Sequence, residues 1–271
     1  MYTFHQMPAL GYGTWNRTAE ETYNGVITAL EVGYRHIDTA QNYENEVDVG
    51  KALTDSGLKR QDIFLTTKVK PENYGSGVIL PSVRESLEKL QTEQVDLLLL
   101  HYPSINNEYP MEDYVAQLAE VYALGLCRHI GVSNFTIPLI DQAIGLLGDG
   151  ILVNNQVELH PFMQNRPIAG HCKSLGVSIT AYSPIARGGV VGEPVLNTIA
   201  QRHEATESQV SLAFLMAEGY TVIPAARSRE RIEENFLSSN LSLSIEEIEK
   251  IRTLDAGKRL VDGPWCPKWD V

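Results

Sequence analysis

Short runs rich in β-branched residues and leucine alternate with longer amphipathic segments along the whole sequence. This alternation is typical of repeated strand–helix units whose strands form a parallel sheet. The strand-like runs number eight, at residues 9–15, 35–39, 63–68, 95–101, 129–133, 153–159, 178–182 and 221–224. Eight such units predict an α/β fold of the (β/α)8 or TIM-barrel type.

The segments between these runs carry helical patterns, most clearly at residues 18–32, 78–90, 113–124 and 207–217. In the last of them, Val210, Ala213, Phe214 and Ala217 recur at three-to-four spacing and share one face. A helix is also expected to open at Thr136-Ile137-Pro138, because proline suits the first turn. Glycines follow several helical stretches as C-terminal stops, at Gly33, Gly57, Gly125, Gly176 and Gly219.

One domain is expected over residues 1–271, because no proline-rich linker, charge block or low-complexity stretch divides the chain. A doubly wound dinucleotide fold is disfavoured, since no Gly-x-Gly-x-x-Gly motif follows an early strand. The Gly11-Tyr12-Gly13 triplet falls within the first strand-like run instead.

Charge and composition exclude several classes of partner. The net charge of −12 opposes binding to nucleic acid or an anionic membrane, because the mean field repels phosphate. A phosphorylated ligand therefore needs a local basic pocket. The longest apolar runs are far shorter than the roughly 20 residues that cross a bilayer, so no membrane segment is expected.

The N-terminus and the cysteines favour a cytoplasmic protein. The first 15 residues lack the basic start and apolar stretch of a secretory signal. Cys127, Cys172 and Cys266 are widely spaced and form no Cys-x-x-Cys motif, which suits a reducing compartment. The seven histidines show neither His-x-x-x-His nor His-Glu-x-x-His spacing, so we expect no metal site.

Four polar residues lie at or just beyond the ends of strand-like runs: Asp38, Tyr43, Lys68 and His101. The carboxyl ends of barrel strands converge on one face, so these side chains are expected to meet there. A phenol has a pKa of about 10 and needs a neighbouring cation and hydrogen-bonding partner to donate a proton near pH 7. Lys68 and His101 can supply these, while Asp38 holds Lys68 charged. Each residue alone has a structural explanation, but together they favour an acid–base centre.

A competing chemistry on the same barrel is glycoside hydrolysis by paired carboxylates. This chemistry needs two available carboxylates, and it is disfavoured because Asp38 would be paired with Lys68. Glu158 is the other carboxylate at a matching strand end.

The motifs GYRHIDTAQNYENE, FLTTK, VDLLLLHYP, IGVSNF, NQVELHP, AYSP and the late VIP…RERIEEN closely resemble the aldo-keto reductases, and they cover residues 9–236. The resemblance implies a TIM barrel that reversibly reduces aldehydes or ketones to alcohols with NAD(P)H and without a metal. It implies that Tyr43 is the general acid and that Lys68 lowers its pKa. Asp38 would pair with Lys68, and His101 would polarise and orient the carbonyl.

The same resemblance implies that Ser133, Asn134 and Gln156 hold the nicotinamide carboxamide and that Tyr182 stacks on the nicotinamide ring. The alternatives are that Asn134 caps the helix beginning near Thr136 and that Tyr182 is a core aromatic. Further cofactor contacts are expected from Gly13, Thr14, Trp15, Asp38, Ser183 and Ile185.

The adenosine end of the cofactor would meet Arg231, Glu234 and Asn235. Here the sequence departs from the family pattern, because Ala225-Ala226 stands where many members have Lys-Ser. Arg227, Arg229 and Arg231 remain nearby, and a guanidinium suits a phosphate. We therefore expect NADPH as the cofactor with NADH as a secondary one; alternatively, these arginines only solvate a helix face.

The substrate rim is expected to be polar. Lys70 and Tyr102 occupy positions where relatives often have tryptophan, and Lys70 is either a docking charge or a solvated lysine. A C-terminal tail over residues 256–271 is expected to cross the barrel mouth. Pocket-lining or chain-anchoring roles are open for the tryptophans Trp15, Trp265 and Trp269.

Small polar aldehydes, α-dicarbonyls, keto acids and keto esters are the expected substrates, and the resemblance implies a monomer. The rival hypothesis is a non-catalytic nucleotide-sensing subunit that docks a partner through an exposed apolar patch. The complete set of four centre residues favours catalysis. The physiological substrate, the stereochemistry and the direction in the cell do not follow from the sequence.

Overall fold

The computed structural model describes residues 6–270, and its eight strands form one parallel sheet in chain order. Each strand pairs with the next one along the chain, as expected for repeated strand–helix units. The strands are β1 (Tyr12–Gly13), β2 (His36–Asp38), β3 (Phe64–Val69), β4 (Val95–Leu100), β5 (Cys127–Ser133), β6 (Leu152–Glu158), β7 (Ser178–Tyr182) and β8 (Thr221–Val222).

The sheet curls until its last strand meets the residues that precede its first. Leu10 forms a parallel bridge with Val222. The Val222 amide donates to the Ala9 carbonyl and the Gly11 amide donates to the Val222 carbonyl, each at 2.8 Å. This arrangement is that of a (β/α)8 barrel. The first and last strands are shorter than the predicted runs 9–15 and 221–224, and β8 ends before Pro224, which has no amide hydrogen to extend the ladder.

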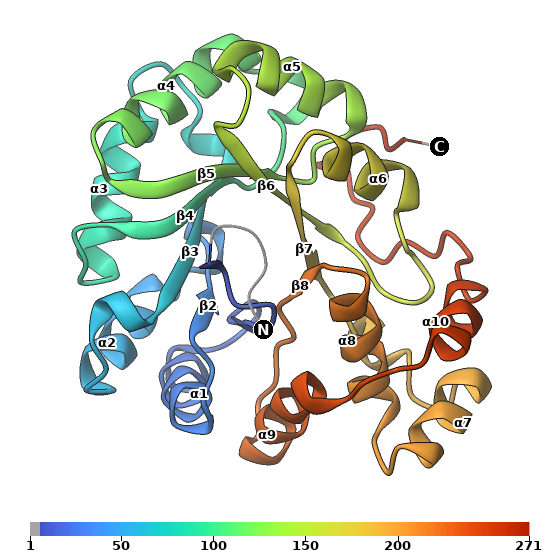
Figure 1. Ribbon diagram of the computed structural model, residues 1–271. Helices are drawn as coiled ribbons and strands as arrows, with labels where there is room; N and C mark the ends of the chain where they lie inside the picture. The colour runs from blue at the N-terminus through green and yellow to red at the C-terminus, as the bar shows by residue number, and fades with distance from the viewer. Residues whose placement is uncertain (1–5, 271) are drawn as a thin grey trace.

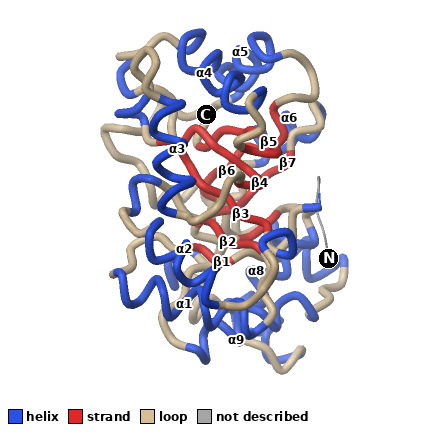
Figure 2. Tube along the Cα trace, turned by 90° about the vertical axis from the view of Figure 1, so that its left-hand side faces the viewer, coloured by secondary structure: helices blue, strands red, loops and turns tan. Residues whose placement is uncertain are grey.

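Helices surround the strands on all sides (Figures 1 and 2). Among residues 6–270, no helix is both long enough and apolar enough to cross a bilayer. Two helices rather than one connect β7 to β8, and the first of them was not predicted. The helices are α1 (Ala19–Val32), α2 (Glu46–Asp55), α3 (Ile79–Lys89), α4 (Met111–Ala123), α5 (Ile137–Leu147), α6 (Arg166–Ser174), α7 (Pro194–Arg202), α8 (Glu207–Ala217), α9 (Arg229–Leu237) and α10 (Ile245–Arg252).

Local sequence signals fix the ends of α1. The Thr18 hydroxyl accepts from the Glu21 amide at 3.3 Å, and the Glu21 carboxylate accepts from the Thr18 amide at 3.1 Å. This reciprocal capping box satisfies two amides that an unpaired helix start would leave without partners. The helix ends at Gly33, whose φ of 125° lies in a region that favours glycine.

Helix α8 departs from the one-sided pattern predicted for it. Val210, Ala213 and Phe214 are buried, but Ala217 is exposed. Leu212 and Leu215, which belong to the other faces, are also buried. Ala217 is the last residue of the helix and lies outside the core. The middle of α8 is covered on nearly every side because the helix packs against α7 and α9 as well as β8.

The barrel interior contains a separate apolar cluster as well as buried polar residues. Leu98 and Leu100 of β4 join the large cluster between strands and helices, whereas Leu97 and Leu99 form a separate cluster with Met7. Successive residues of a strand point to opposite sides, so this second cluster fills the barrel interior. At the carboxyl ends of β2 and β3 and just after β4, the buried residues Asp38, Lys68 and His101 are ionisable.

Candidate active site

Lys68, on β3, lies at the centre of a buried cluster. Its ammonium donates to Asp38 Oδ1 at 2.5 Å, to the Thr39 carbonyl at 2.8 Å and to the Tyr43 hydroxyl at 3.3 Å. The side chain is fully buried, and burial lowers the pKa of Lys68, while Asp38 acts in the opposite direction. Three acceptors match the three hydrogens of a charged ammonium.

Asp38, at the end of β2, is held from two sides. Its second oxygen, Oδ2, accepts from the Gln156 side-chain amide at 2.8 Å, so β6 contributes to the cluster from across the barrel. Gln156 was expected to hold the nicotinamide carboxamide, and its nitrogen is committed to Asp38. The carboxylate is thereby fixed in the orientation that faces Lys68.

Tyr43 ends the short 3₁₀ helix η2 (Gln41–Tyr43) beside the cluster. Its ring meets the His101 imidazole edge to face, with ring centroids 5.6 Å apart. Burial of the phenol, followed by the negative charge of Asp38, raises the pKa of Tyr43 well above its ordinary value. Burial thus dominates the pKa of Tyr43, and the expected lowering of this pKa by Lys68 stays a prediction. The phenol therefore carries its proton at neutral pH.

His101 follows β4 and is a neutral imidazole at pH 7. Burial, and then the charge of Lys68, lower the pKa of His101 well below its ordinary value. Its Nδ1 atom is buried with no hydrogen-bond partner among residues 6–270. Its main-chain carbonyl accepts from the Asn134 side chain at 3.1 Å.

The residues expected around the nicotinamide form a hydrogen-bonded network that joins β5, β6 and β7. The Tyr182 hydroxyl donates to Asn134 Oδ1 at 2.8 Å. The Asn134 amide donates in turn to the Ser133 hydroxyl at 3.0 Å, and that hydroxyl donates to the Gln156 carbonyl at 2.9 Å. The network fixes the half-buried Tyr182 ring beside the cluster.

The alternative role of Asn134 as a helix cap is wrong. Thr136 holds the capping position of α5, and its side chain makes no capping bond within the described chain. The Ile137 amide instead donates to the Asp270 carboxylate at 2.8 Å, across 133 residues of sequence. A carboxylate at a helix N-terminus is also favoured by the helix dipole.

Loops after β1 and β7 border the cluster. Both the amide and the hydroxyl of Thr14 donate to the Asp38 carbonyl, at 3.0 and 3.1 Å. The Arg187 guanidinium lies over the exposed Trp15 ring, 5.0 Å from its centroid, so the two loops meet. Ser183 has a φ of 51°, an unusual conformation for a residue other than glycine.

The arginines expected at the adenosine end all pair with carboxylates. Arg227 contacts Glu21 at 3.1 Å and Arg231 contacts Glu234 at 2.8 Å, while Arg229 pairs with Glu31 and Glu233. Half or more of each arginine side chain is exposed. The arginines surround the N-terminus of α9, which Ser228 caps, and a helix N-terminus favours anions. This segment therefore fits a phosphate group, which would compete with the carboxylates. Asn235 is buried within α9.

The residues expected to contact the substrate lie in different places: Lys70 faces α3, whereas Tyr102 and Trp265 lie near the buried cluster. Lys89, by its hydrogen bond and charge, and to a lesser extent the charge of Lys70, lower the pKa of Glu85 on α3, so Lys70 lies near α3. Tyr102 stacks on the His101 ring with centroids 5.4 Å apart, and hydrogen bonding with Trp265 and Tyr182 partly offsets the rise in its pKa caused by burial. Tyr102 and Trp265 thus lie together near the cluster.

The C-terminal tail runs from α10 past α6 toward α5 (Figure 1). Trp269 stacks under the Arg259 guanidinium at 3.8 Å, and its indole donates to Asp262 at 3.0 Å. Trp269 therefore holds the tail in its own fold, whereas the exposed Trp265 lies beside Tyr102. The hydrogen bonds that join the tail to Glu158 and to the start of α5 were not predicted, because their partners lie far apart in sequence.

Comparison with known proteins decides the family. The sequence matches the Aldo/keto reductase family over residues 9–256. The chain belongs to the aldo/keto reductase family. Members of this family reduce carbonyl groups to alcohols, so the protein is an oxidoreductase. The prediction of the family from the sequence motifs is confirmed.

Curated aldo/keto reductases resemble the chain over nearly its whole length. Methylglyoxal reductase DkgB of Escherichia coli O157:H7 is 44% identical over 265 residues, which are 97% of this chain and 99% of that protein. Methylglyoxal reductase DkgA of Escherichia coli K12 is 35% identical and covers 95% of this chain and 93% of its own.

Solved aldo/keto reductases share the fold. A protein provisionally named 2,5-diketo-D-gluconic acid reductase B superposes with a TM-score of 0.94 at 39% identity, over 98% of this chain and 95% of that one. Aldose reductase of Schistosoma japonicum gives a TM-score of 0.92 at 30% identity, over 99% of both chains. Among the members of the family, the sequence motifs had pointed to 2,5-diketo-D-gluconate reductase B.

Proposed function

We propose that this aldo/keto reductase is an NADPH-dependent reductase of small carbonyl compounds, with Tyr43 as its general acid. The observation that carries the proposal is the contact of the Lys68 ammonium with both Asp38, at 2.5 Å, and the Tyr43 hydroxyl, at 3.3 Å. Such a cluster at the carboxyl ends of barrel strands is where enzymes of this fold hold their catalytic groups.

The proton chemistry follows from these charges. Tyr43 keeps its proton until the carbonyl oxygen gains negative charge, and it then donates that proton. The phenolate that remains is stabilised by the Lys68 ammonium, whose position is fixed by Asp38 and Gln156. The neutral imidazole of His101 orients the carbonyl oxygen by a hydrogen bond. Groups fixed in place before the reaction stabilise developing charge without having to reorganise.

The cofactor would lie across the ends of β5 to β8. A reduced nicotinamide supplies a hydride to the carbonyl carbon when bound there. The Tyr182 ring would form a platform for it, and Ser133, Asn134 and Gln156 would face its carboxamide. We assign further contacts to Gly13, Thr14, Trp15, Asp38, Ser183, Ile185, Arg227, Arg231, Glu234 and Asn235.

NADPH is proposed over NADH because three arginines gather at the N-terminus of α9. Ala225-Ala226 provides neither the cation nor the hydroxyl that many relatives have there, and carboxylates partly neutralise the arginines. NADH is therefore proposed as a secondary cofactor.

The proposed substrates are small α-dicarbonyls and polar aldehydes, with keto acids and keto esters as further members of the class. The methylglyoxal reductases that resemble this chain support the first group. Tyr102 and Trp265 would border the substrate, with Trp15 and Lys70 at the rim. We further propose that the chain forms one barrel domain over residues 1–271 and acts as a monomer in the cytoplasm.

Loss of absorbance at 340 nm tests the proposal directly. The purified protein is mixed with NADPH, and then with NADH, against methylglyoxal, an aromatic aldehyde, a β-keto ester and a diketo sugar acid. We expect oxidation of NADPH with at least one of them, fastest with an α-dicarbonyl. Tight nucleotide binding with no turnover of any carbonyl would instead favour a nucleotide-sensing protein.

A further inference from the structure

Glu158 is a buried carboxylate that the proposed chemistry does not use. It ends β6, and its side chain is fully buried. Its Oε1 atom accepts from the Leu260 amide at 2.6 Å and from His160 Nε2 at 3.0 Å, and its Oε2 atom accepts from the Val261 amide at 2.8 Å. Two consecutive amides of the tail thus converge on one carboxylate.

The charge of Glu158 strengthens this contact. Burial by itself would raise the pKa of Glu158, but hydrogen bonds from His160, Leu260 and Val261 lower it below its ordinary value. A buried carboxylate is costly unless donors surround it, and hydrogen bonds to an ionised acceptor are about twice as strong as neutral ones. The tail therefore has one preferred position against the end of β6.

A compact turn connects this contact to Trp265. The Cys266 amide donates to the Gly263 carbonyl at 2.9 Å, and the Cys266 thiol points back to the Val261 carbonyl at 3.8 Å. A Cβ atom on Gly263 would lie 2.4 Å from the Trp265 ring, so the indole packs directly on this glycine. The position of the Trp265 side chain thus depends on the position of Val261, which Glu158 fixes.

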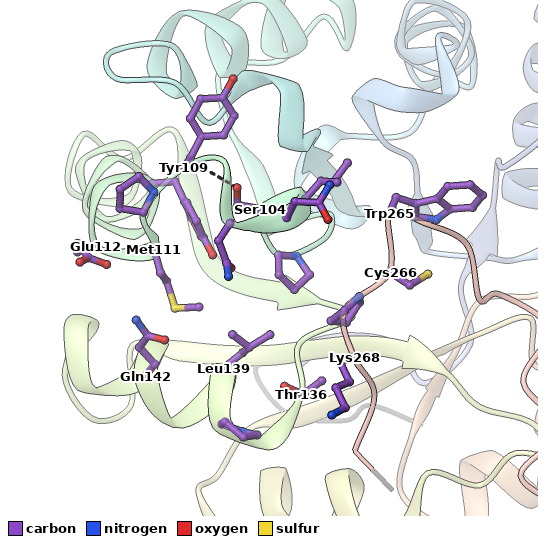
Figure 3. Close-up of a pocket in the computed structure, with 18 residues that line it drawn as sticks. Ser104, Tyr109, Met111, Glu112, Thr136, Leu139, Gln142, Trp265, Cys266 and Lys268 are labelled. Atoms are coloured by element: carbon purple, nitrogen blue, oxygen red, sulfur yellow. Dashed lines mark hydrogen bonds between the residues drawn. The ribbon is translucent and has the colours of Figure 1, made fainter.

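The tail borders a pocket on its other side. A cavity of about 600 Å³ separates it from the loop that follows β4 and from α5, and Trp265, Cys266, Ser104 and Tyr109 are among its lining residues (Figure 3). Because that side is not closely packed, contacts elsewhere must fix the tail. Further contacts of the tail include hydrogen bonds of Ala256 and Lys258 with Phe162, of Gln164 with Asp255, of Arg259 with Asn165 and of Ile137 with Asp270.

We propose that Glu158 is a positioning residue that sets the affinity for the carbonyl substrate. Through Leu260 and Val261 it holds the tail so that Trp265 lies beside Tyr102, which stacks on His101. This inference rests on the proposed function, since it assigns Trp265 to the substrate side of that site. It predicts an effect on the KM of the carbonyl and none on the binding of the nucleotide.

The test compares Glu158→Gln with the matched control Asp96→Asn. Asp96 is also a buried carboxylate that accepts a backbone amide, that of Leu65 at 2.9 Å, but it lies near the start of β4, away from the tail. We expect Glu158→Gln to raise the KM for methylglyoxal about tenfold, with the NADPH Kd changed less than about twofold. Limited trypsin digestion should cleave faster after Lys258 and Arg259. Asp96→Asn should change neither the KM nor the cleavage.

Two further full-length variants separate positioning from a general loss of stability. Gly263→Ala displaces the Trp265 ring without altering Glu158, and it should raise the same KM. Glu158→Asp keeps the charge on a shorter side chain, and its effect should be smaller than that of Glu158→Gln. If Glu158→Gln does not fold, Glu158→Asp must still show a raised KM with an unchanged NADPH Kd.

A double mutant tests whether Glu158 changes the KM through Trp265. In a Trp265→Ala background, Glu158→Gln should have little further effect on the KM, because coupled residues are not additive. An unchanged KM in Glu158→Gln, or an equally large increase in the Trp265→Ala background, would overturn the proposal. If the native protein reduces no carbonyl, the proposed function fails, and the trypsin digestion alone then decides whether Glu158 holds the tail.

Discussion

The buried cluster around Lys68 and the arginine segment at α9 both consist of cations paired with carboxylates, but their surroundings differ. Lys68 and Asp38 are 0% and 2% exposed, whereas Arg227 and Arg231 are 59% and 62% exposed. In the buried cluster each hydrogen of the Lys68 ammonium has a fixed acceptor, and little water competes. Exposed ion pairs contribute little and exchange readily. The buried cluster is therefore suited to a reaction that needs fixed groups. The arginines at α9 are suited to exchanging their carboxylate partners for a bound ligand.

The largest expected effect is that of Tyr43→Phe, which removes only the phenol oxygen from the buried cluster. We expect kcat to fall by about 10²–10⁴-fold, the usual contribution of a general acid, with an unchanged NADPH Kd. Steady-state kinetics and fluorescence titration measure the two quantities. Tyr23→Phe removes an exposed hydroxyl that binds Asp55 and serves as the control. Near-normal turnover of Tyr43→Phe would refute the assignment.

Breaking the buried ion pair should also cost stability. Asp38→Asn leaves the Lys68 ammonium without its counter-ion, and removal of one partner of a buried pair costs about 3–5 kcal/mol. Urea denaturation of this variant measures the loss. Glu31→Gln breaks an exposed pair with Arg229 and should be indistinguishable from the native protein. Equal losses in the two variants would remove the distinction between the regions.

Replacing Arg227 and Arg231 together with alanine should weaken NADPH binding by about tenfold or more and leave NADH binding nearly unchanged, because only NADPH carries the 2′-phosphate. Calorimetric titration with both nucleotides measures this. Arg202→Ala, on α7, removes an exposed arginine elsewhere and serves as the control. Equal weakening of both nucleotides would place the two arginines away from the phosphate.

A smaller effect is expected from Glu21→Gln. Glutamine still satisfies the capping box of α1, so the substitution removes mainly the charge that Arg227 faces. We expect NADPH to bind about twofold to fivefold more tightly and NADH to be unaffected, in keeping with the weakness of exposed pairs. No change in NADPH affinity would mean that Glu21 does not compete with the phosphate.

The smallest expected effect is that of pH on reduction. Because the Tyr43 pKa is raised and the His101 pKa is lowered, both groups stay in their working forms through the neutral range. We expect kcat to be level from about pH 6.5 to about pH 10, the ordinary values of histidine and tyrosine. A decline that begins below pH 9 would show that Lys68 lowers the Tyr43 pKa once the reactants are bound.

The barrel and the centre of the site were predictable because each of their signals is local. Asp38, Lys68 and His101 each follow an apolar strand, and parallel strands in sequence order must bring such residues together. The rise of the Tyr43 pKa by burial was not predictable, since it depends on how much water the folded chain excludes.

Long-range partners were likewise hidden from the sequence. Glu158 binds backbone amides about 100 residues away, and amides carry no residue-specific signal. Asp270 caps α5 from the far end of the chain, and Leu212 and Leu215 are buried because α7, α9 and β8 surround the middle of α8. In each case the contact or the burial depends on residues from another part of the chain, which the local sequence does not reveal.

The apolar cluster of Met7, Leu97, Leu99 and Val153 fills part of the barrel interior away from the Lys68 cluster. If reactants and products pass through the opening at the carboxyl ends of the strands, they share one passage, and a turnover begins only after the previous product has left. A molecule lodged in that passage would slow the enzyme even if it fitted the acid–base centre poorly. Release of product and entry of substrate, rather than the chemical step, can then limit the rate of turnover.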